Sequence, residues 1–367
     1  MKILHISNTR RLTHGQRMQL KAEYDASKNI KDITWDILAF HTEAPVYSFE
    51  RKIPYFFQGL ILRKLYSWIS ILKVYTKYDI VIERKLPLDF FNLYFGWFIQ
   101  NRLTVHHAKE VEEMKILRKG LKGIFASKVE QFSGWINSKQ VLGFIGVTKE
   151  IATYENNIYK TNLPELFYPN GIDTENIVLA EDKRKNEQMN AVFMSGSFNP
   201  WHGLDLLLVA LLKNKELVIA NNLTIHLIGK LTEHQLIQIN KMDIGIKVYG
   251  HLDISQYQSI LKKCDFGIGS LAMFREGLSE GSTLKVREYL AAGIPVYSGH
   301  KDSALPQNFP YYYYEPKINI ENMVNFGIRM RFYSRKDIKI RAIPYIEKEN
   351  LMKNLIKEFD ILELSNA

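Results

Sequence analysis

Two glutamates, Glu280 and Glu288, stand eight positions apart on either side of a short polar segment. If one helix carried both, the rise between them would be about 12 Å. Paired carboxylates that hydrolyse glycosides stand roughly 5–9 Å apart, so this spacing does not fit such a hydrolase. We therefore expect Glu280 in a loop and Glu288 inside the following helix.

The residues between the glutamates have the composition of a phosphate site. The backbone N–H groups at a helix start are unpaired, and the helix dipole adds positive potential there. The residues expected to offer these groups are Gly281, Ser282, Thr283 and Leu284, with the cation Lys285 beside them. Two carboxylates flanking a phosphate cradle suit a ligand with hydroxyl groups on both sides of its phosphates, such as a nucleotide sugar. The alternative is an exposed helix with a Lys285–Glu288 pair, worth a few tenths of a kcal/mol.

The surrounding pattern predicts a strand, loop, helix and strand. Residues 266–271 form an apolar run, and Ser282 or Thr283 offers a side-chain oxygen to cap a helix over 284–292. Gly293 ends that helix before the next strand. In open α/β sheets, ligands bind where strand carboxyl ends lead into helix starts.

Together these motifs resemble a known family. Glu280-x7-Glu288, followed by Tyr-Leu-Ala-Ala-Gly-Ile-Pro-Val, resembles the E-x7-E signature of the retaining glycosyltransferases of family 4, of the bacterial glycan-assembly type. That resemblance implies the GT-B fold, with Glu280 near the donor sugar as a catalytic residue, Glu288 on the ribose, and the intervening backbone on the diphosphate. The Pro-Asn-Gly-Ile-Asp run that begins at Pro169 resembles the turn that ends the family's N-terminal domain.

The resemblance implies further site residues. Gly15 corresponds to the acceptor-side loop, where many members have two adjacent glycines. His106 and His107 end a predicted strand where members often hold a histidine facing the donor sugar, although a structural histidine is the alternative for either. Gly250 ends a strand whose following backbone contacts the base in the family.

One departure concerns the charge that should face the diphosphate. Ser197 and His202 stand where many members carry an arginine and a lysine. Neutralisation is therefore expected from Lys285, Lys230, Arg275 or a protonated His202.

The chain has 367 residues, which predicts two domains. We expect an α/β protein of the GT-B class, with two Rossmann-like domains and an interdomain cleft. Residues 1–178 would form the acceptor domain, with a C-terminal helix over 345–367 packing back on it. Residues 179–190 would be the linker, and residues 191–344 the nucleotide-sugar domain.

Several partners and cofactors are not expected. The first strand leads into a loop without G-x-G-x-x-G, which argues against a nicotinamide or flavin. Cys264 is the sole cysteine, so an intramolecular disulfide and a cysteine-based zinc site are excluded. The resemblance implies no metal and no cofactor. The start of the chain is expected to be a strand, no apolar run is long enough to span a bilayer, and the protein is expected in the cytoplasm.

Residues 51–139 hold sixteen Lys and Arg against seven Asp and Glu, within a chain of net charge +10. This concentration indicates a polyanion or an anionic membrane surface, and nucleic acid is not the expected partner. Helices are predicted over 54–78, 88–100 and 110–139, and the second is aromatic-rich. The first and third are the candidates to lie on the inner face of the membrane, although the helix over 54–78 could equally pack on the sheet. The alternative is a solvated basic face.

The expected function is transfer of a sugar, of the hexosyltransferase type, from a UDP- or GDP-sugar to a lipid-linked or surface glycan. Two alternatives remain at this point: a non-catalytic GT-B partner subunit with a degraded donor site, and a nucleotide-sugar epimerase.

Overall fold

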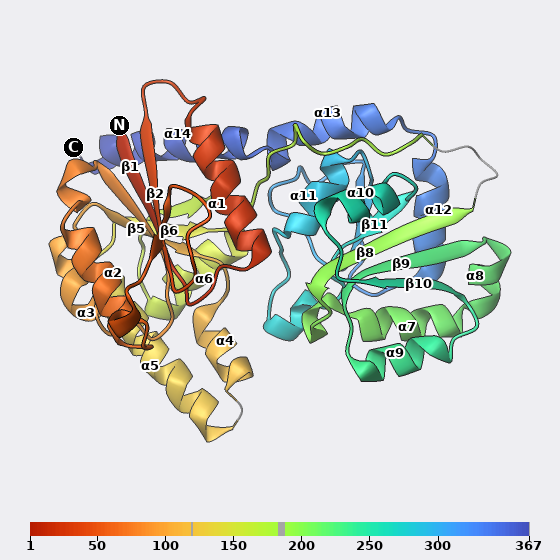
Figure 1. Ribbon diagram of the computed structural model, residues 1–367, viewed down its shortest axis with the longest axis horizontal. Helices are drawn as coiled ribbons and strands as arrows, with labels where there is room; N and C mark the ends of the chain where they lie inside the picture. The colour runs from red at the N-terminus through yellow and green to blue at the C-terminus, as the bar shows by residue number, and fades with distance from the viewer. Residues whose placement is uncertain (119, 183–187, 367) are drawn as a thin grey trace. The chain divides into compact units, whose positions relative to one another are not determined.

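The computed structural model describes residues 1–118, 120–182 and 188–366, and it divides into two compact units (Figure 1). The first unit comprises Met1–Asn170 and Lys348–Ala367, and the second comprises Gly171–Glu347. Residues 179–190, predicted as the linker, belong to the second unit; of these, 183–187 lie outside the described residues. Both units are Rossmann-like, which confirms the predicted α/β fold class.

The first unit is built on a parallel sheet of seven strands within the described residues, in the order β3-β2-β1-β4-β5-β6-β7. The strands are β1 (Lys2–Asn8), β2 (Thr34–His41), β3 (Glu50–Lys52), β4 (Ile80–Arg84), β5 (Arg102–His106), β6 (Gly143–Gly146) and β7 (Glu165–Phe167). Because all of them are parallel, their carboxyl ends meet at one edge of the sheet.

Helices cover this sheet on its two faces. They are α1 (His14–Ser27), α2 (Leu62–Leu72), α3 (Asn92–Phe95), α4 (Glu110–Leu117), α5 (Leu121–Asn137), α6 (Lys149–Tyr159) and α14 (Lys348–Asn366), with short 3-10 helices η1 (Tyr55–Phe57), η2 (Tyr75–Lys77) and η3 (Gly96–Phe98). Trp68 of α2 is buried with residues of β1 and β4 in one part of the core. Figure 1 shows α1 and α14 side by side.

The long helices predicted over 54–78 and 110–139 are each broken in the structure. Gly59 separates η1 from α2, and only the middle of that segment buries an apolar face. Gly120 has φ 69°, a left-handed conformation that interrupts the second segment between α4 and α5. Residues 88–100 contain only the short helices α3 and η3.

The second unit carries a parallel sheet of six strands within its described residues, in the order β10-β9-β8-β11-β12-β13. The strands are β8 (Met189–Ser197), β9 (Leu223–Lys230), β10 (Gly245–Gly250), β11 (Phe266–Ile268), β12 (Val296–Ser298) and β13 (Tyr312–Tyr314). The helices are α7 (Leu204–Lys213), α8 (Lys215–Ala220), α9 (Glu233–Asn240), α10 (Ile254–Leu261), α11 (Leu284–Ala291), α12 (Ile320–Met330) and α13 (Arg335–Ile346), with 3-10 helices η4 (Pro200–His202) and η5 (Met273–Glu276).

A single apolar cluster fills this unit and holds α11 against the sheet. Val286, Tyr289 and Leu290 of α11 are fully buried in that cluster, together with β8, β11 and β12. The hydroxyl of Tyr289 accepts a hydrogen bond from the backbone N–H of Met194 in β8, at 2.8 Å. The start of α11 is therefore fixed at the carboxyl edge of the sheet.

Candidate active site

The segment between the two glutamates forms the start of α11, as its sequence predicts. Glu280 precedes the helix in a bridge with Lys301, and Glu288 lies within the helix. Two details differ from prediction. The N–H of Gly281 donates to the carbonyl of Lys301 at 2.8 Å, because this bridge pairs it, so it is not an open donor. Thr283 occupies the N-cap position without a side-chain cap bond, and the other predicted cap, Ser282, accepts from Arg287 instead.

Lys285 is the clearest polar feature at this helix start. Its Nζ is buried and has no hydrogen-bond partner among the described residues, and it lies 5.0 Å from the ring centre of Phe193. Burial lowers the pKa of this ammonium to about 7, against the opposing charge of Glu288. The Oγ1 of Thr283 is also buried without a partner within the described chain. An anionic ligand with several acceptor oxygens would supply the hydrogen-bond partners that this buried cation and hydroxyl lack.

Glu288 lies on α11 three residues after Lys285, and the charges of the two groups act on each other. Burial raises the pKa of its carboxyl to about 7, while the hydroxyl of Tyr257 and the charge of Lys285 lower it. The exposed pair of the alternative interpretation is therefore not what the structure contains. A buried carboxylate of raised pKa accepts hydrogen bonds strongly once a ligand supplies hydroxyl donors.

Strand ends of the second unit hold three more of the predicted donor residues. Ser197, Lys230 and Gly250 end β8, β9 and β10, which are neighbours in the sheet. Ser197 and Lys230 are opposite each other in the strand register, and both are exposed. Gly250 adopts a left-handed φ of 69°.

Two cations proposed for the diphosphate are engaged otherwise. His202 cannot supply charge near neutral pH, because burial and the charge of Lys285 lower its pKa to about 2. Its Nδ1 accepts from the N–H of Asn199 at 3.0 Å. Arg275 donates to both carboxylate oxygens of Asp205, at 2.9 and 2.7 Å. Of the proposed cations, Lys285 and Lys230 remain.

Sequence reasoning missed a polar group that faces the same loop from the segment after β12. His300 is buried; its Nδ1 contacts the carbonyl of Ser270 at 2.9 Å, while its Nε2 has no partner in the described part of the chain. A Cβ added to Gly281 would lie 2.7 Å from that Nε2, so only glycine fits there. His300 follows strand β12 closely, and this position was the sequence signal that could have identified it.

In the first unit, the structure separates the two candidate histidines. His106 is fully buried, with its Nδ1 3.0 Å from Glu110 and its Nε2 3.0 Å from the Thr104 hydroxyl. His106, Glu110 and Glu155 bring one potential ligand atom each within 4.8 Å of one another. His106 thus belongs to an internal polar cluster. His107 instead lines a pocket at the carboxyl edge of the sheet.

Gly15 lies in the first turn of α1 and not in the preceding loop. The helix begins at His14 because Thr13 caps it: the Thr13 hydroxyl accepts from the N–H of Gln16, whose side chain accepts from the Thr13 N–H. The loop between β1 and α1 is therefore short.

Comparison with solved structures agrees with this architecture. HepE from Anabaena, in complex with UDP and glucose, superposes with a TM-score of 0.65 at 12% identity, covering 98% of this chain and 99% of that one. The lipopolysaccharide outer core galactosyltransferase WaaB superposes with a TM-score of 0.64 at 10% identity, covering 100% of both chains. WaaG, a glycosyltransferase involved in lipopolysaccharide biosynthesis, gives 0.59 at 14% identity over 99% of both chains. No protein-family model and no curated protein sequence matches the chain.

At these identities the likeness shows the fold. The chain has the GT-B architecture of two Rossmann-like units, as predicted.

Proposed function

We propose that this protein is a retaining glycosyltransferase of the hexosyltransferase type, which transfers a sugar from a UDP- or GDP-sugar to an acceptor hydroxyl. The observation that carries the proposal is Lys285, whose buried Nζ lacks a partner among the described residues at the N-terminus of α11. An unpaired buried cation beside a helix start is costly to the fold and favourable to a bound diphosphate. The complexes of HepE with UDP and with UDP-glucose support the choice of donor.

In this mechanism the donor binds the second unit. The diphosphate lies at the start of α11 and on Lys285, Glu288 accepts from the ribose hydroxyls, and Glu280 supports the sugar as it gains positive charge. The bond from the anomeric carbon to the phosphate oxygen breaks, and the acceptor oxygen bonds to that carbon on the same face. The departing phosphate oxygen takes the acceptor proton. Pre-organised donors at the leaving group lower the barrier.

Replacing Glu288 tests the donor site directly. Glu288→Gln is expected to weaken UDP binding by roughly 10- to 100-fold, because hydrogen bonds to a charged group are worth about 1.5–3 kcal/mol. The measurement is the UDP-induced rise in unfolding temperature over a concentration series. Glu321→Gln, at an exposed position of α12, is the matched control and should leave that rise unchanged.

Titration with UDP and GDP, together with an assay of product release, separates the alternatives. A non-catalytic partner subunit with a degraded donor site would show no response to UDP or GDP. An epimerase would interconvert nucleotide sugars without an acceptor, whereas a transferase releases nucleoside diphosphate in proportion to acceptor.

We further propose that the acceptor is a lipid-linked or surface glycan met at an anionic membrane, with α5 on the lipid. Within the described residues, no helix is long and apolar enough to cross a membrane. One face of α5 is nevertheless apolar and exposed: Leu121 is 84% exposed and Phe125 72% exposed. Exposed lysines flank them, Lys122 and Lys128 among them. Apolar groups mixed with lysines are typical of helices that lie on anionic bilayers.

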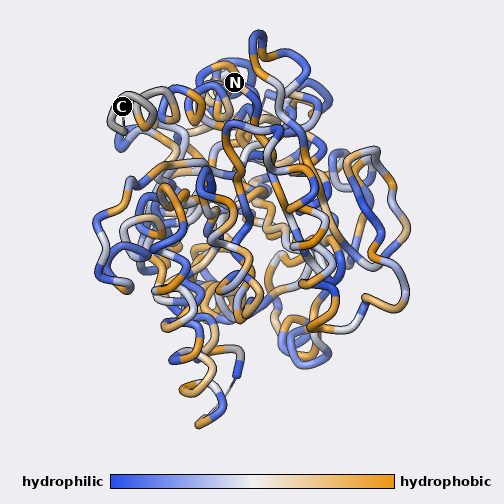
Figure 2. The backbone as a smooth tube through the Cα atoms, turned by 90° about the vertical axis from the view of Figure 1, so that its left-hand side faces the viewer, coloured by the Kyte–Doolittle hydropathy of each residue, from blue (hydrophilic) through white to orange (hydrophobic). Residues whose placement is uncertain are grey.

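The other candidate membrane face, residues 54–78, places two of its basic side chains inside the fold. Arg63 and Lys64 of α2 are buried, since α2 packs its apolar face on the sheet. The Nζ of Lys64 donates to the carbonyls of Pro87 and Leu88. The membrane proposal therefore rests on α4 and α5. Figure 1 shows these helices extending from the rest of the first unit, and Figure 2 shows hydrophobic and hydrophilic residues alternating along them.

Vesicle binding tests this surface. The measurement is sedimentation with phosphatidylglycerol-containing vesicles at low salt. The affinity of Phe125→Ser for these vesicles is expected to be about tenfold lower than that of the wild type, because burying an aromatic side chain is worth roughly 1.5–3 kcal/mol. Ile219→Ser, at a 58% exposed site in the second unit, is the control. Equal sedimentation of both variants, or none of the wild type, would contradict the role of α5.

A further inference from the structure

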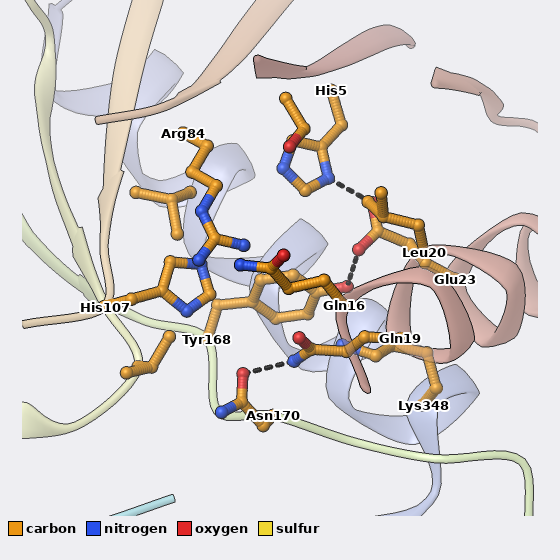
Figure 3. A pocket seen from close by; sticks show the side chains of 13 residues that line it. His5, Gln16, Gln19, Leu20, Glu23, Arg84, His107, Tyr168, Asn170 and Lys348 are labelled. Carbon is orange, nitrogen blue, oxygen red and sulfur yellow. Dashed lines mark hydrogen bonds and ion pairs between the residues drawn. The ribbon is translucent and has the colours of Figure 1, made fainter. Parts of the chain in front are cut away.

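A small polar pocket lies in the first unit, whereas the residues proposed to hold the diphosphate and ribose of the donor lie in the second. It lies at the carboxyl ends of β1, β4 and β5, and its walls come from α1, from the segment after β7 and from the start of α14 (Figure 3). Its cavity volume is about 20 Å³, enough for one small group and not for a sugar ring. Carboxyl edges of parallel sheets are where this architecture binds ligands.

Arg84, the last residue of β4, lines this pocket without a partner. Its guanidinium makes no hydrogen bond and no ion pair to any residue that the structure describes. Burial lowers its pKa, while the charges of Glu110 and Glu113 act on it from a distance in the opposite sense. A guanidinium stays charged in proteins and presents a planar fork of donors. Left unpaired in a partly enclosed space, that fork is matched by a planar or tetrahedral oxyanion.

The rest of the lining adds positive potential and a ring nitrogen that has no partner among the described residues. Lys348 is buried, with its Nζ 4.3 Å from the ring centre of Tyr168. Burial, followed by the charges of Arg84, His5 and Lys348, lowers the pKa of His107 well below its usual value, so His107 is a neutral hydrogen-bonding group. The Nε2 of His5, a residue only 6% exposed, has no partner within the described chain.

The one carboxylate in the lining is already engaged. The Oε1 of Glu23 accepts from Trp35 at 2.8 Å and contacts the Nδ1 of His5 at 2.5 Å. Its Oε2 accepts from the hydroxyl of Tyr168 at 3.1 Å. Figure 3 shows the contacts of Glu23 with His5 and Tyr168 on the side of the pocket away from Arg84. Glu23 therefore balances its own neighbours and does not pair with the guanidinium.

We propose that this pocket binds an oxyanion substituent, a carboxylate or a phosphate, on the acceptor glycan, with Arg84 as its principal partner. Gln16 and Gln19 of α1 face the same space in Figure 3 and can hydrogen-bond hydroxyl groups beside the anion. The inference rests on the proposed function only in naming the acceptor as the source of the anion. It makes the acceptor an anionic glycan, such as one bearing a uronate or a sugar phosphate.

The test uses glucuronate and glucose 6-phosphate as probes, with glucose as the uncharged match. Both anions should raise the unfolding temperature of the full-length protein, and glucose should not. Arg84→Gln should weaken the response to both anions at least tenfold, and Arg84→Lys should retain part of it, because a lysine keeps the charge and loses the fork. Arg329→Gln, at an exposed arginine of α12, is the matched control.

UDP-induced stabilisation, measured on the same variants, keeps the two proposals distinguishable. Unchanged UDP binding by Arg84→Gln together with lost anion binding supports the pocket. Equal anion binding by wild type and Arg84→Gln, or competition between UDP and the anions, would place the anions elsewhere and overturn the inference. Comparison of the two anions assigns the source: a response to glucuronate alone indicates a carboxylate, and one to glucose 6-phosphate alone a phosphate. If UDP itself has no effect, the donor proposal fails while the anion result still stands.

Discussion

Lys285→Met is expected to lower kcat/KM for sugar transfer by about 10²–10³-fold, the usual effect of removing one pre-organised donor from a developing anion. Lys285 is the buried cation at the start of α11. Two other groups proposed to neutralise the diphosphate cannot replace it, because His202 is neutral and Arg275 is paired with Asp205. Among the described residues of the second unit, no other lysine at this helix combines burial with an Nζ that lacks a partner. The measurement is steady-state transfer from UDP-glucose to an accepted glycan.

The same variant should change how donor binding depends on pH. A lysine whose pKa is lowered to about 7 is protonated below pH 7 and loses its charge as the pH rises. The affinity of the wild type for UDP-glucose should therefore fall by up to about tenfold per pH unit above pH 7, since binding then requires uptake of a proton. Lys285→Met should lack this slope. Calorimetric titration between pH 6 and 8.5 measures it.

The ligand-free stability of the variant provides the check on folding. Methionine removes an ammonium that no described residue hydrogen-bonds, so the unfolding temperature should not fall. Lys336→Met, at an exposed position in α13, is the control for a lost surface lysine. Full activity in Lys285→Met would show that the diphosphate is neutralised elsewhere, with Lys230 the next residue to test.

Asp302→Ala is expected to cost about 3–5 kcal/mol of unfolding free energy, because it leaves the buried charge of Arg287 without its partner. Both side chains of this pair are fully buried. One nitrogen of Arg287 donates to Asp302 Oδ1 at 3.0 Å and to the hydroxyl of Ser282 at 2.9 Å. The pair thus ties the glycine-containing loop to α11, so its loss should also weaken UDP binding. Denaturant-induced unfolding and the UDP titration measure the two effects.

An exposed acidic residue provides the contrast for this ion pair. Asp243 pairs with Lys215 at 3.0 Å, but its side chain is 95% exposed, so Asp243→Ala should cost less than about 1 kcal/mol. Replacing both buried partners, in Arg287→Met with Asp302→Leu, should restore much of the lost stability, because no uncompensated charge remains. A double variant as unstable as Asp302→Ala would mean that Arg287 and Asp302 act through shape and not through charge.

The second unit was largely predictable from local sequence. The apolar runs predicted the succession of strand, loop, helix and strand around α11. The spacing of Glu280 and Glu288 placed the first in the loop and the second on the helix, as found. What spacing could not supply was the pairing of the N–H of Gly281 with Lys301, or the approach of His300. Both depend on a strand that lies later in the chain.

The first unit was harder to predict at its site. Two adjacent histidines were equivalent by sequence, yet alternation of side chains along β5 puts His106 among buried carboxylates and leaves His107 at the pocket. The long amphipathic patterns over 54–78 and 110–139 predicted continuous helices. Breaks at Gly59 and Gly120 divide them, because helix continuity depends on the backbone between apolar stretches as well as on their period.

The sequence by itself determined the two-domain α/β plan and the strand, loop and helix of the segment proposed to bind the donor, because these signals act over a few residues. Only the tertiary structure decided which charges are free. Arg275 and Lys285 are equivalent by composition, but a distant Asp205 pairs with the first and none of the described residues hydrogen-bonds the second. The same holds for Arg84 in the first unit. Whether a buried cation has a partner is set by contacts between segments far apart in the chain, and local sequence carries no record of them.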